Sequence, residues 1–390
     1  MNVYSERMVR LQKLLVEKRI DLAILNLNCD LYYYTGTIQP LYLLVPAQGG
    51  AIAVARKALE RIGQDSPGLI VEVFNNTRDL SGIIQRHNFQ KAAKLGFSLE
   101  NTAYATVNRW RQLFGETEIV NLSEDLHLLR MIKNESEIGI YREAGQIMSE
   151  IPEVVKENFR PGMTELELSA IIEKYMRVNG SAGLTRCRAE EVEMIYGVCS
   201  AGTNAIAGTK FNGVCGGTGL SAAVPYGAGW KEIKPGEPVV LDYAFNYQGY
   251  HIDQTRLFCW GRPSQEISHA FQAMLQIQDL VFAELGPDAF WTTPYEKALQ
   301  LAEKLGYGEA FMGIGSEKVR FVGHGVGLEL DEPPYLAPKM NYPLSLGMTI
   351  AVEPKVVLPG IGVIGNEDTV LITENGFERL TTASREMIVV

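Results

Sequence analysis

The chain has 390 residues, 46% of them hydrophobic and 21% charged, so it can bury a large core and its length suggests two or three domains. Its formal net charge of -10 and sequence pI of about 5.2 weigh against nucleic acid as the main partner, because phosphate binding requires clustered Lys and Arg side chains. No stretch resembles a membrane span, and the N-terminus has charges throughout, unlike a secretory signal. We therefore expect a soluble protein of the cytoplasm with no membrane partner.

The first third of the chain alternates helical and strand-like patterns. From Ser5 to Arg19 the apolar residues recur at helical spacing, and DLAILNLNCDLYYYTG then turns apolar and aromatic in the manner of a strand. Strand-like LYLLVP and AIAVA follow, then helical KALERI and strand-like LIVEVF. This alternation predicts an α/β domain over residues 1–130.

Residues 131–390 are predicted to form a second domain of α+β type. The segment HLLRMIKNESEIGIYREAGQIMSEIPEVVKENF has a long 3.6-residue period, and TELELSAIIEKYMRVNG predicts a further helix after Pro161 and Gly162. Strand signals then dominate from Met194 to Phe258 and from Arg320 to the C-terminus. Two helical patterns, SQEISHAFQAMLQIQDLVFAEL and YEKALQLAEKLG, separate these strand groups.

The cysteines are scattered, without CxxC or zinc-ligand spacing, and their number is odd. They are predicted to be reduced structural thiols, and Cys259, at the end of an apolar strand pattern, is interpreted as buried and inert. The full set is Cys29, Cys187, Cys199, Cys215 and Cys259.

Carboxylates interrupt several apolar strand patterns. Asp242 lies in PVVLDYAF and Glu353 in MTIAVEPKVVL, and Asp253 and Glu367 have similar but looser contexts. A buried carboxylate needs a cation or several hydrogen-bond donors. The turn sequence NYQGY lies between Asp242 and Asp253, and PGIG lies between Glu353 and Glu367. Two β-hairpins are therefore predicted to present two acids each.

His324, among the glycines of VGHGVG, would add a nitrogen ligand to these acids. Four carboxylates and one imidazole suit two divalent cations, with Mn²⁺ foremost and Co²⁺, Fe²⁺ or Zn²⁺ as alternatives. The competing interpretation is that each acid pairs with Arg or Lys, or lies at an exposed edge, and that the histidine is an ordinary core residue.

Four successive segments resemble the signatures of the pita-bread family, which includes methionine aminopeptidases, Xaa-Pro aminopeptidases, prolidases and creatinase. They are VVLDYAFNYQGYHIDQTRLFCWG, GHGVGLELDEPP, LGMTIAVEPKVVLPG and GNEDTVLITENGFERLT. Their order and spacing match over most of the segment from Lys133 onward, and the N-terminal third resembles the extra domain of prolidases and creatinase. The resemblance thus implies a creatinase/prolidase-like domain over 1–130 and a pita-bread catalytic domain over 131–390.

The resemblance implies that Asp242, Asp253, His324, Glu353 and Glu367 are the metal ligands. Two divalent ions bridging a water or hydroxide generate a nucleophile at neutral pH in this family. Glu353 would also take the proton of that water. No further cofactor is implied, and the partners implied are a small peptide substrate and a second copy of the chain in a homodimer.

Both auxiliary histidines of the family pattern are missing. The position of the second His is Asp331, followed by Glu332, and an ionised Asp cannot donate a hydrogen bond to a developing oxyanion. Near the expected place of the other His stands Tyr226, which either donates a hydrogen bond or packs as a loop residue. His251, two residues before Asp253, either supplies the missing proton donor or faces solvent beside the site.

Smaller departures surround the ligands. The family often has Gly where this sequence has Lys355, and Arg where it has Gly365. The segment from Cys199 to Gly227 is rich in small residues and is predicted to be an active-site loop. Arg186 and Arg188 would either hold a substrate carboxylate or form surface ion pairs.

Three functions remain open from the sequence. The first is a dinuclear metallopeptidase that removes an N-terminal residue, foremost from Xaa-Pro di- or oligopeptides. The second is a pita-bread hydrolase or lyase that acts on a small non-peptide substrate, suggested by the missing histidines. The third is a non-catalytic scaffold, which the intact ligand set disfavours.

Overall fold

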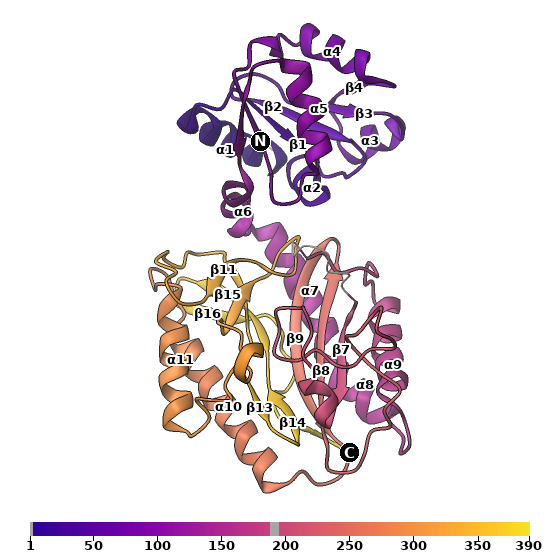
Figure 1. Cartoon of the computed structure of the whole chain (residues 1–390), viewed down its shortest axis with the longest axis vertical. Helices are drawn as coiled ribbons and strands as arrows, with labels where there is room; N and C mark the ends of the chain where they lie inside the picture. The colour runs from indigo at the N-terminus through magenta and orange to yellow at the C-terminus, as the bar shows by residue number, and fades with distance from the viewer. Residues whose placement is uncertain (1–2, 188–194) are drawn as a thin grey trace. The chain divides into compact units, whose positions relative to one another are not determined.

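The computed structural model describes residues 3–187 and 195–390. The chain forms two compact units, Met1–Arg130 and Met131–Val390 (Figure 1). Each unit has its own sheets and its own buried core. In the described part of the chain, no helix is long and apolar enough to cross a membrane.

The N-terminal unit is built on a six-stranded mixed sheet with the order β4-β3-β2-β1-β5-β6. Apolar strand residues and the helical Trp110 form its core. The fold is the expected α/β class. Its strands are β1 (Leu22–Leu25), β2 (Tyr42–Pro46), β3 (Ile52–Ala55), β4 (Ile70–Val73), β5 (Lys94–Phe97) and β6 (Glu118–Asn121), and its helices are α1 (Val3–Lys18), α2 (Asn28–Thr35), α3 (Leu59–Asp65), α4 (Thr77–Arg86), the 3₁₀ turn η1 (Phe89–Lys91), α5 (Tyr104–Phe114) and α6 (Ser123–Met131), which continues past the unit boundary.

The segment DLAILNLNCDLYYYTG is a strand only at its start. Leu22–Leu25 forms β1, whereas Asn28–Thr35 forms α2, which ends at the left-handed Gly36 (φ 79°). Most residues of α2 are buried, including Tyr33 and Tyr34. A helix buried on most sides lacks the polar stripe that reveals helical periodicity, so the pattern was wrong as a strand prediction here.

The C-terminal unit places its strands between two groups of helices. Figure 1 shows α10 and α11 on one side of the strands and α8 and α9 on the other. The sheets have the orders β11-β10-β12-β15-β16, β13-β14 and β17-β9-β8-β7. The strands are β7 (Gly197–Ala201), β8 (Pro238–Tyr247), β9 (Tyr250–Cys259), β10 (Gly323–Gly325), β11 (Glu332–Leu336), β12 (Thr349–Val352), β13 (Lys355–Leu358), β14 (Gly362–Gly365), β15 (Asp368–Thr373), β16 (Gly376–Arg379) and β17 (Ile388–Val389).

The long helical pattern before residue 160 is divided into α6, α7 (Glu135–Ser149) and α8 (Ile151–Asn158). Asn134 starts α7 with a capping box, in which its side chain accepts from the Glu137 N–H and the Glu137 side chain accepts from the Asn134 N–H. The remaining helices are α9 (Glu165–Val178), α10 (Gln265–Ala283) and α11 (Thr292–Lys304), with the 3₁₀ turns η2 (Gly202–Ile206) and η3 (Gly315–Glu317). The expected α+β arrangement is thus confirmed.

Both predicted hairpins are present. In the β8–β9 hairpin Tyr247 pairs with Tyr250, and the turn residues Gln248 and Gly249 have φ values of 50° and 92°, as a type I′ turn requires. In the β13–β14 hairpin Leu358 pairs with Gly362. These hairpins bring acids that are distant in sequence to one place.

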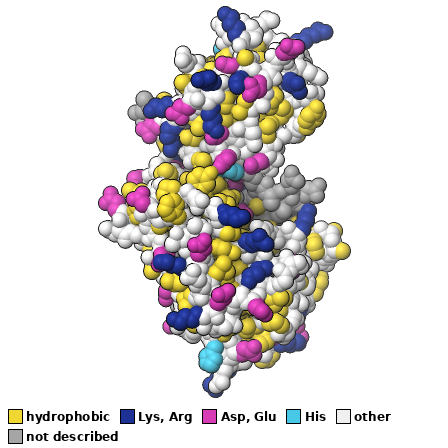
Figure 2. All heavy atoms as spheres, turned by 60° about the vertical axis from the view of Figure 1, so that its left-hand side comes forward, with side chains coloured by type: hydrophobic (Ala, Val, Ile, Leu, Met, Phe, Trp, Pro, Cys, Tyr) yellow, Lys and Arg dark blue, Asp and Glu magenta, His cyan; other side chains and the backbone are white. Residues whose placement is uncertain are grey.

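The thiols and the surface match an ordinary globular protein. Cys199, Cys215 and Cys259 are free thiols, and burial raises the pKa of Cys259 to about 11, which keeps it protonated and inert. Figure 2 shows acidic, basic and apolar side chains interspersed on the face that it presents.

Candidate metal centre

The residues at the five ligand positions line one pocket of the C-terminal unit. Asp242 lies on β8, Asp253 on β9 and His324 on β10. Glu353 follows β12 directly, and Glu367 lies between β14 and β15. The pocket has a volume of about 860 Å³, part of which is open to solvent. Three strands and two junctions between strands therefore direct their polar side chains into one cavity.

Three of these side chains form the tightest group. One ligand atom from each of Asp253, His324 and Glu367 lies within 4.8 Å of the other two. His324 Nε2 is 3.4 Å from Glu353 Oε1 and 4.0 Å from Asp253 Oδ2. Glu367 Oε1 is buried and has no hydrogen-bond partner, an arrangement that is costly without a cation.

A lysine that sequence reasoning did not place in the centre lies among the acids. Lys355 Nζ is 2.8 Å from Asp242 Oδ2, 2.7 Å from Glu353 Oε2 and 3.4 Å from Glu367 Oε2. Its side chain is only 2% exposed. The signal was present, because residues two apart on an extended chain point to the same side and Lys355 follows Glu353 by two.

Burial and interactions with neighbouring charges give the acids of the centre different pKa values. Burial, with repulsion from Asp242, raises the pKa of Asp253 to about 7. Burial and the charge of Asp253 likewise raise the pKa of Glu367. For Glu353 burial acts in the same direction, but Lys355 and His324 outweigh it and lower the pKa to about 2.

The two basic groups of the centre, His324 and Lys355, both have raised pKa values. Burial disfavours the charge on His324, but its contacts with Glu353, Asp331 and Asp253 prevail and raise its pKa. Burial also disfavours the charge on Lys355, and the surrounding carboxylates again prevail and raise its pKa. Lys355 is therefore an ammonium ion at neutral pH.

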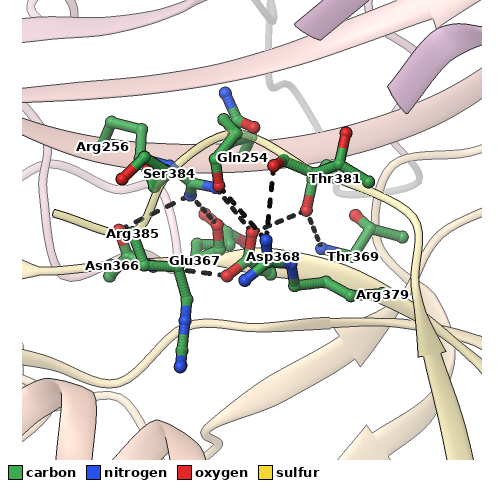
Figure 3. A network of polar contacts seen from close by, with 12 residues as sticks. Gln254, Arg256, Asn366, Glu367, Asp368, Thr369, Arg379, Thr381, Ser384 and Arg385 are labelled. Carbon is green, nitrogen blue, oxygen red and sulfur yellow. Dashed lines mark hydrogen bonds and ion pairs between the residues drawn. The ribbon is translucent and has the colours of Figure 1, made fainter. Parts of the chain in front are cut away.

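A buried arginine holds the backbone around Glu367. Arg256 Nη1 donates to the Glu367 carbonyl oxygen at 2.7 Å, and its Nη2 donates to Asp368 Oδ1 at 2.7 Å. Thr381 Oγ1 donates to the same Asp368 oxygen at 2.8 Å. Figure 3 shows these residues gathered around the segment that carries Glu367. On the carboxylate itself, Thr255 Oγ1 donates to Oε2 at 2.6 Å, so Glu367 is fixed from two sides.

Asp331 and Tyr226 both line the pocket. Asp331 Oδ1 is 4.0 Å from His324 Nδ1, and the Asp331 side chain is 36% exposed. The neighbouring Glu332 points elsewhere, since its Oε1 accepts from the buried Lys133 Nζ at 3.1 Å. Asp331 and Tyr226 thus both border the cavity that contains the five ligand-position residues.

His251 is not among the pocket-lining side chains, and the expectation that it faces solvent is wrong. It is fully buried; its Nδ1 lies 3.1 Å from the Gly327 carbonyl oxygen, and its Nε2 accepts from the Arg186 N–H at 3.0 Å. Burial lowers the pKa of His251 to about 4. With both ring nitrogens engaged, the imidazole ties loop backbone together, and it has no proton to give to a substrate.

The segment from Cys199 to Gly227 begins in β7 and η2 and then contributes residues 211–216 and Tyr226 to the pocket wall. Its chain is held by backbone contacts such as the donation from Gly227 N–H to the Gly216 carbonyl at 2.7 Å.

Of the two arginines considered for a substrate carboxylate, Arg186 contacts His251 through its backbone, and Arg188 lies outside the described residues.

Comparison with known proteins assigns both parts of the chain. Residues 7–132 match the creatinase/prolidase N-terminal domain, and residues 139–374 match metallopeptidase family M24. The chain belongs to metallopeptidase family M24. It is 28% identical to the Xaa-Pro dipeptidase of Pyrococcus furiosus over 389 residues, which cover 98% of this chain and 100% of the relative.

Solved structures of M24 relatives have the same two-domain fold. The Xaa-Pro dipeptidase from Bacillus anthracis superimposes with a TM-score of 0.83 at 25% identity, covering 99% of this chain and 100% of that one. The prolidase from Pyrococcus furiosus gives 0.78 at 26% identity, covering 96% and 100%. The prolidase-like, two-domain pita-bread fold is therefore confirmed.

Membership of M24 implies divalent metal ions, and the side chains fit this only in part. Asp253, His324 and the unpartnered oxygen of Glu367 suit one divalent cation. One oxygen of each remaining ligand-position acid, Asp242 Oδ2 and Glu353 Oε2, already contacts the Lys355 ammonium. The residues present thus fit one ion well and a second poorly.

Proposed function

We propose that the protein is a metal-dependent peptidase that removes the N-terminal residue from Xaa-Pro dipeptides or short oligopeptides. The observation that carries this proposal is the convergence of Asp253, His324, Glu353 and Glu367 on one pocket in an M24 chain. The full-length similarity to a protein named Xaa-Pro dipeptidase supports the choice of substrate.

In this proposal Asp253, His324 and Glu367 would hold a divalent cation, foremost Mn²⁺, with Co²⁺, Fe²⁺ or Zn²⁺ as alternatives. Such a cation, when bound, polarises a carbonyl group and makes water nucleophilic at neutral pH. Glu353 Oε2 is engaged by Lys355, which leaves Oε1 as the proposed acceptor of the proton of the attacking water.

Other pocket residues would bind and orient the peptide. Phe211, Phe321 and Leu330 give the pocket apolar walls for the substrate side chains. The surrounding carboxylates favour the positively charged amino terminus of a peptide. Because an ionised Asp331 cannot donate a hydrogen bond, we assign the donation to the developing oxyanion to the Tyr226 hydroxyl.

The decisive experiment is turnover of Xaa-Pro dipeptides and tripeptides by metal-stripped protein, with and without added Mn²⁺. Turnover that requires Mn²⁺ and is lost in Asp253→Asn is expected, and the length preference separates a dipeptidase from an aminopeptidase. No turnover by Mn²⁺-loaded protein with native circular dichroism would contradict the proposal.

A second candidate is a hydrolase or lyase activity on a small non-peptide substrate. Two pocket residues favour it, Lys355 and Asp331, because each departs from the peptidase pattern at a position that contacts the centre. A screen of small amides, cyclic amidines and hydroxy acids on the same preparations distinguishes the two candidates, since each predicts turnover in only one panel.

We also propose a homodimer, which is what the family resemblance implies, and a cytoplasmic location. Light scattering coupled to size-exclusion chromatography should give about twice the chain mass of 43.2 kDa. A mass equal to that of one chain across the micromolar range would contradict the dimer.

A further inference from the structure

The Lys355 ammonium fills a position between the acids where a metal ion would be expected. Its closest contacts, at 2.8 Å and 2.7 Å, are with Asp242 Oδ2 and Glu353 Oε2. Divalent cations bind oxygen at about 2.0–2.6 Å. An ion that bound these two oxygens would therefore compete with the ammonium group for them.

The hairpin fixes the lysine in this position. Lys355 pairs with Gly365 across the β13–β14 hairpin, and the absence of a side chain on Gly365 leaves room for the lysine stem. The Lys355 backbone carbonyl accepts from the Met312 N–H at 2.9 Å, which holds the start of the strand. The side chain is only 2% exposed, and its ammonium group is held by the contacts with Asp242 and Glu353.

The charges of the centre lead to the same conclusion. Asp242, Asp253, Glu353 and Glu367 carry four formal negative charges when ionised, of which Lys355 neutralises one. One divalent cation leaves a single net negative charge, whereas two would make the centre positive with the ammonium beside them. Close buried cations repel one another strongly even at an effective dielectric constant of about 20.

A place for one cation remains beside the lysine. Asp253, His324 and Glu367 lie together, and the buried Oε1 of Glu367 has no partner. We propose that Lys355 permanently replaces one of the two metal ions of an M24 centre, so that this protein binds a single divalent cation through Asp253, His324 and Glu367. This inference concerns stoichiometry and holds whichever substrate is turned over.

The test is the metal content of the full chain after chelation, reloading with Mn²⁺ and desalting. Elemental analysis should give one Mn²⁺ per chain, with the electron paramagnetic resonance spectrum of an isolated ion. Lys355→Ala should bind two ions per chain with a spin-coupled spectrum, because it frees Asp242 and Glu353. The control Lys304→Ala, at the exposed end of α11, should stay at one.

Two ions or none in the folded wild-type protein would overturn the proposal, as would one ion in folded Lys355→Ala. If Lys355→Ala does not fold, the two aspartates separate the alternatives. Asp242→Asn should retain the ion, because Asp242 binds the lysine, whereas Asp253→Asn should weaken Mn²⁺ binding at least tenfold. Equal weakening in both variants would contradict the assignment.

Discussion

Lys355 and Gly365 face each other across the β13–β14 hairpin, and a Cβ atom on residue 365 would lie 2.5 Å from Lys355 Cγ. It would also lie 2.7 Å from the Pro354 carbonyl oxygen. The two departures from the family pattern at 355 and 365 are thus neighbours in space. A side chain at 365 and the buried lysine cannot occupy the hairpin together without a shift of the backbone.

Gly365→Ala should therefore lower the free energy of unfolding by about 1–3 kcal/mol, the usual cost of overpacking. Urea denaturation of the metal-free protein measures it. Gly139→Ala is the matched control, because a Cβ there meets nothing within 4 Å and lies inside α7. That variant should be neutral or stabilised by up to about 1 kcal/mol, and equal losses in both would refute the steric argument.

Arg256→Met should destabilise the protein by about 3–5 kcal/mol, because it leaves the buried Asp368 carboxylate without its cation. Arg142→Met removes the exposed ion pair with Glu378, which has two contacts of 2.8 and 2.7 Å, and should cost no more than about 1 kcal/mol. Chemical denaturation of both variants gives the comparison, and similar losses would contradict it.

Asp331→His should raise kcat/KM for Xaa-Pro substrates at least about tenfold, because a neutral or charged imidazole can donate where a carboxylate cannot. Asp331→Glu, which keeps an ionised carboxylate, should show no gain. Steady-state kinetics of Mn²⁺-loaded protein tests both. A fall in kcat/KM for Asp331→His would show that the acid itself is required.

His251 predicts a loss of stability in mild acid. Burial lowers its pKa from 6.5 to about 4, so the unfolded chain binds a proton more readily than the folded one. The stabilisation is complete above pH 6.5 and is lost as pH falls toward 4, by about 3 kcal/mol. Urea denaturation of metal-free protein at pH 7.5 and 4.5 should show a smaller pH effect in His251→Gln than in the wild type.

The exposed His269 of α10 supplies the control for this measurement. His269→Gln should keep the full pH effect of the wild type. If His251→Gln keeps it as well, the imidazole is not the group that is protonated on unfolding.

The sequence was most informative where charged residues interrupt apolar patterns. Acids inside apolar strand patterns, joined by turn sequences, predicted the hairpin that carries Asp242 and Asp253 and the hairpin that Glu353 and Glu367 flank. The sequence also contained a helix boundary that the prediction did not use, since Asn134 and Glu137 have the spacing of a capping box inside the long periodic segment.

The sequence was least informative about what covers a side chain. The two-residue period placed His251 near Asp253 but did not show that the backbone at Gly327 and Arg186 would occupy both ring nitrogens. The same period relates Lys355 to Glu353, but it was not used to place the lysine, and only the folded hairpin shows that its ammonium reaches Asp242 on another sheet. Contacts between distant segments depend on packing, which no local pattern contains.

A cation built into β13 differs from a dissolved one in that no chelator can remove it. The ammonium of Lys355 is present as soon as the hairpin forms, at any concentration of free metal in the surroundings. Part of the repulsion among the buried acids is thus relieved by the polypeptide itself, before any ion arrives. To that extent the arrangement of the pocket is set by the amino-acid sequence and does not depend on the supply of metal ions.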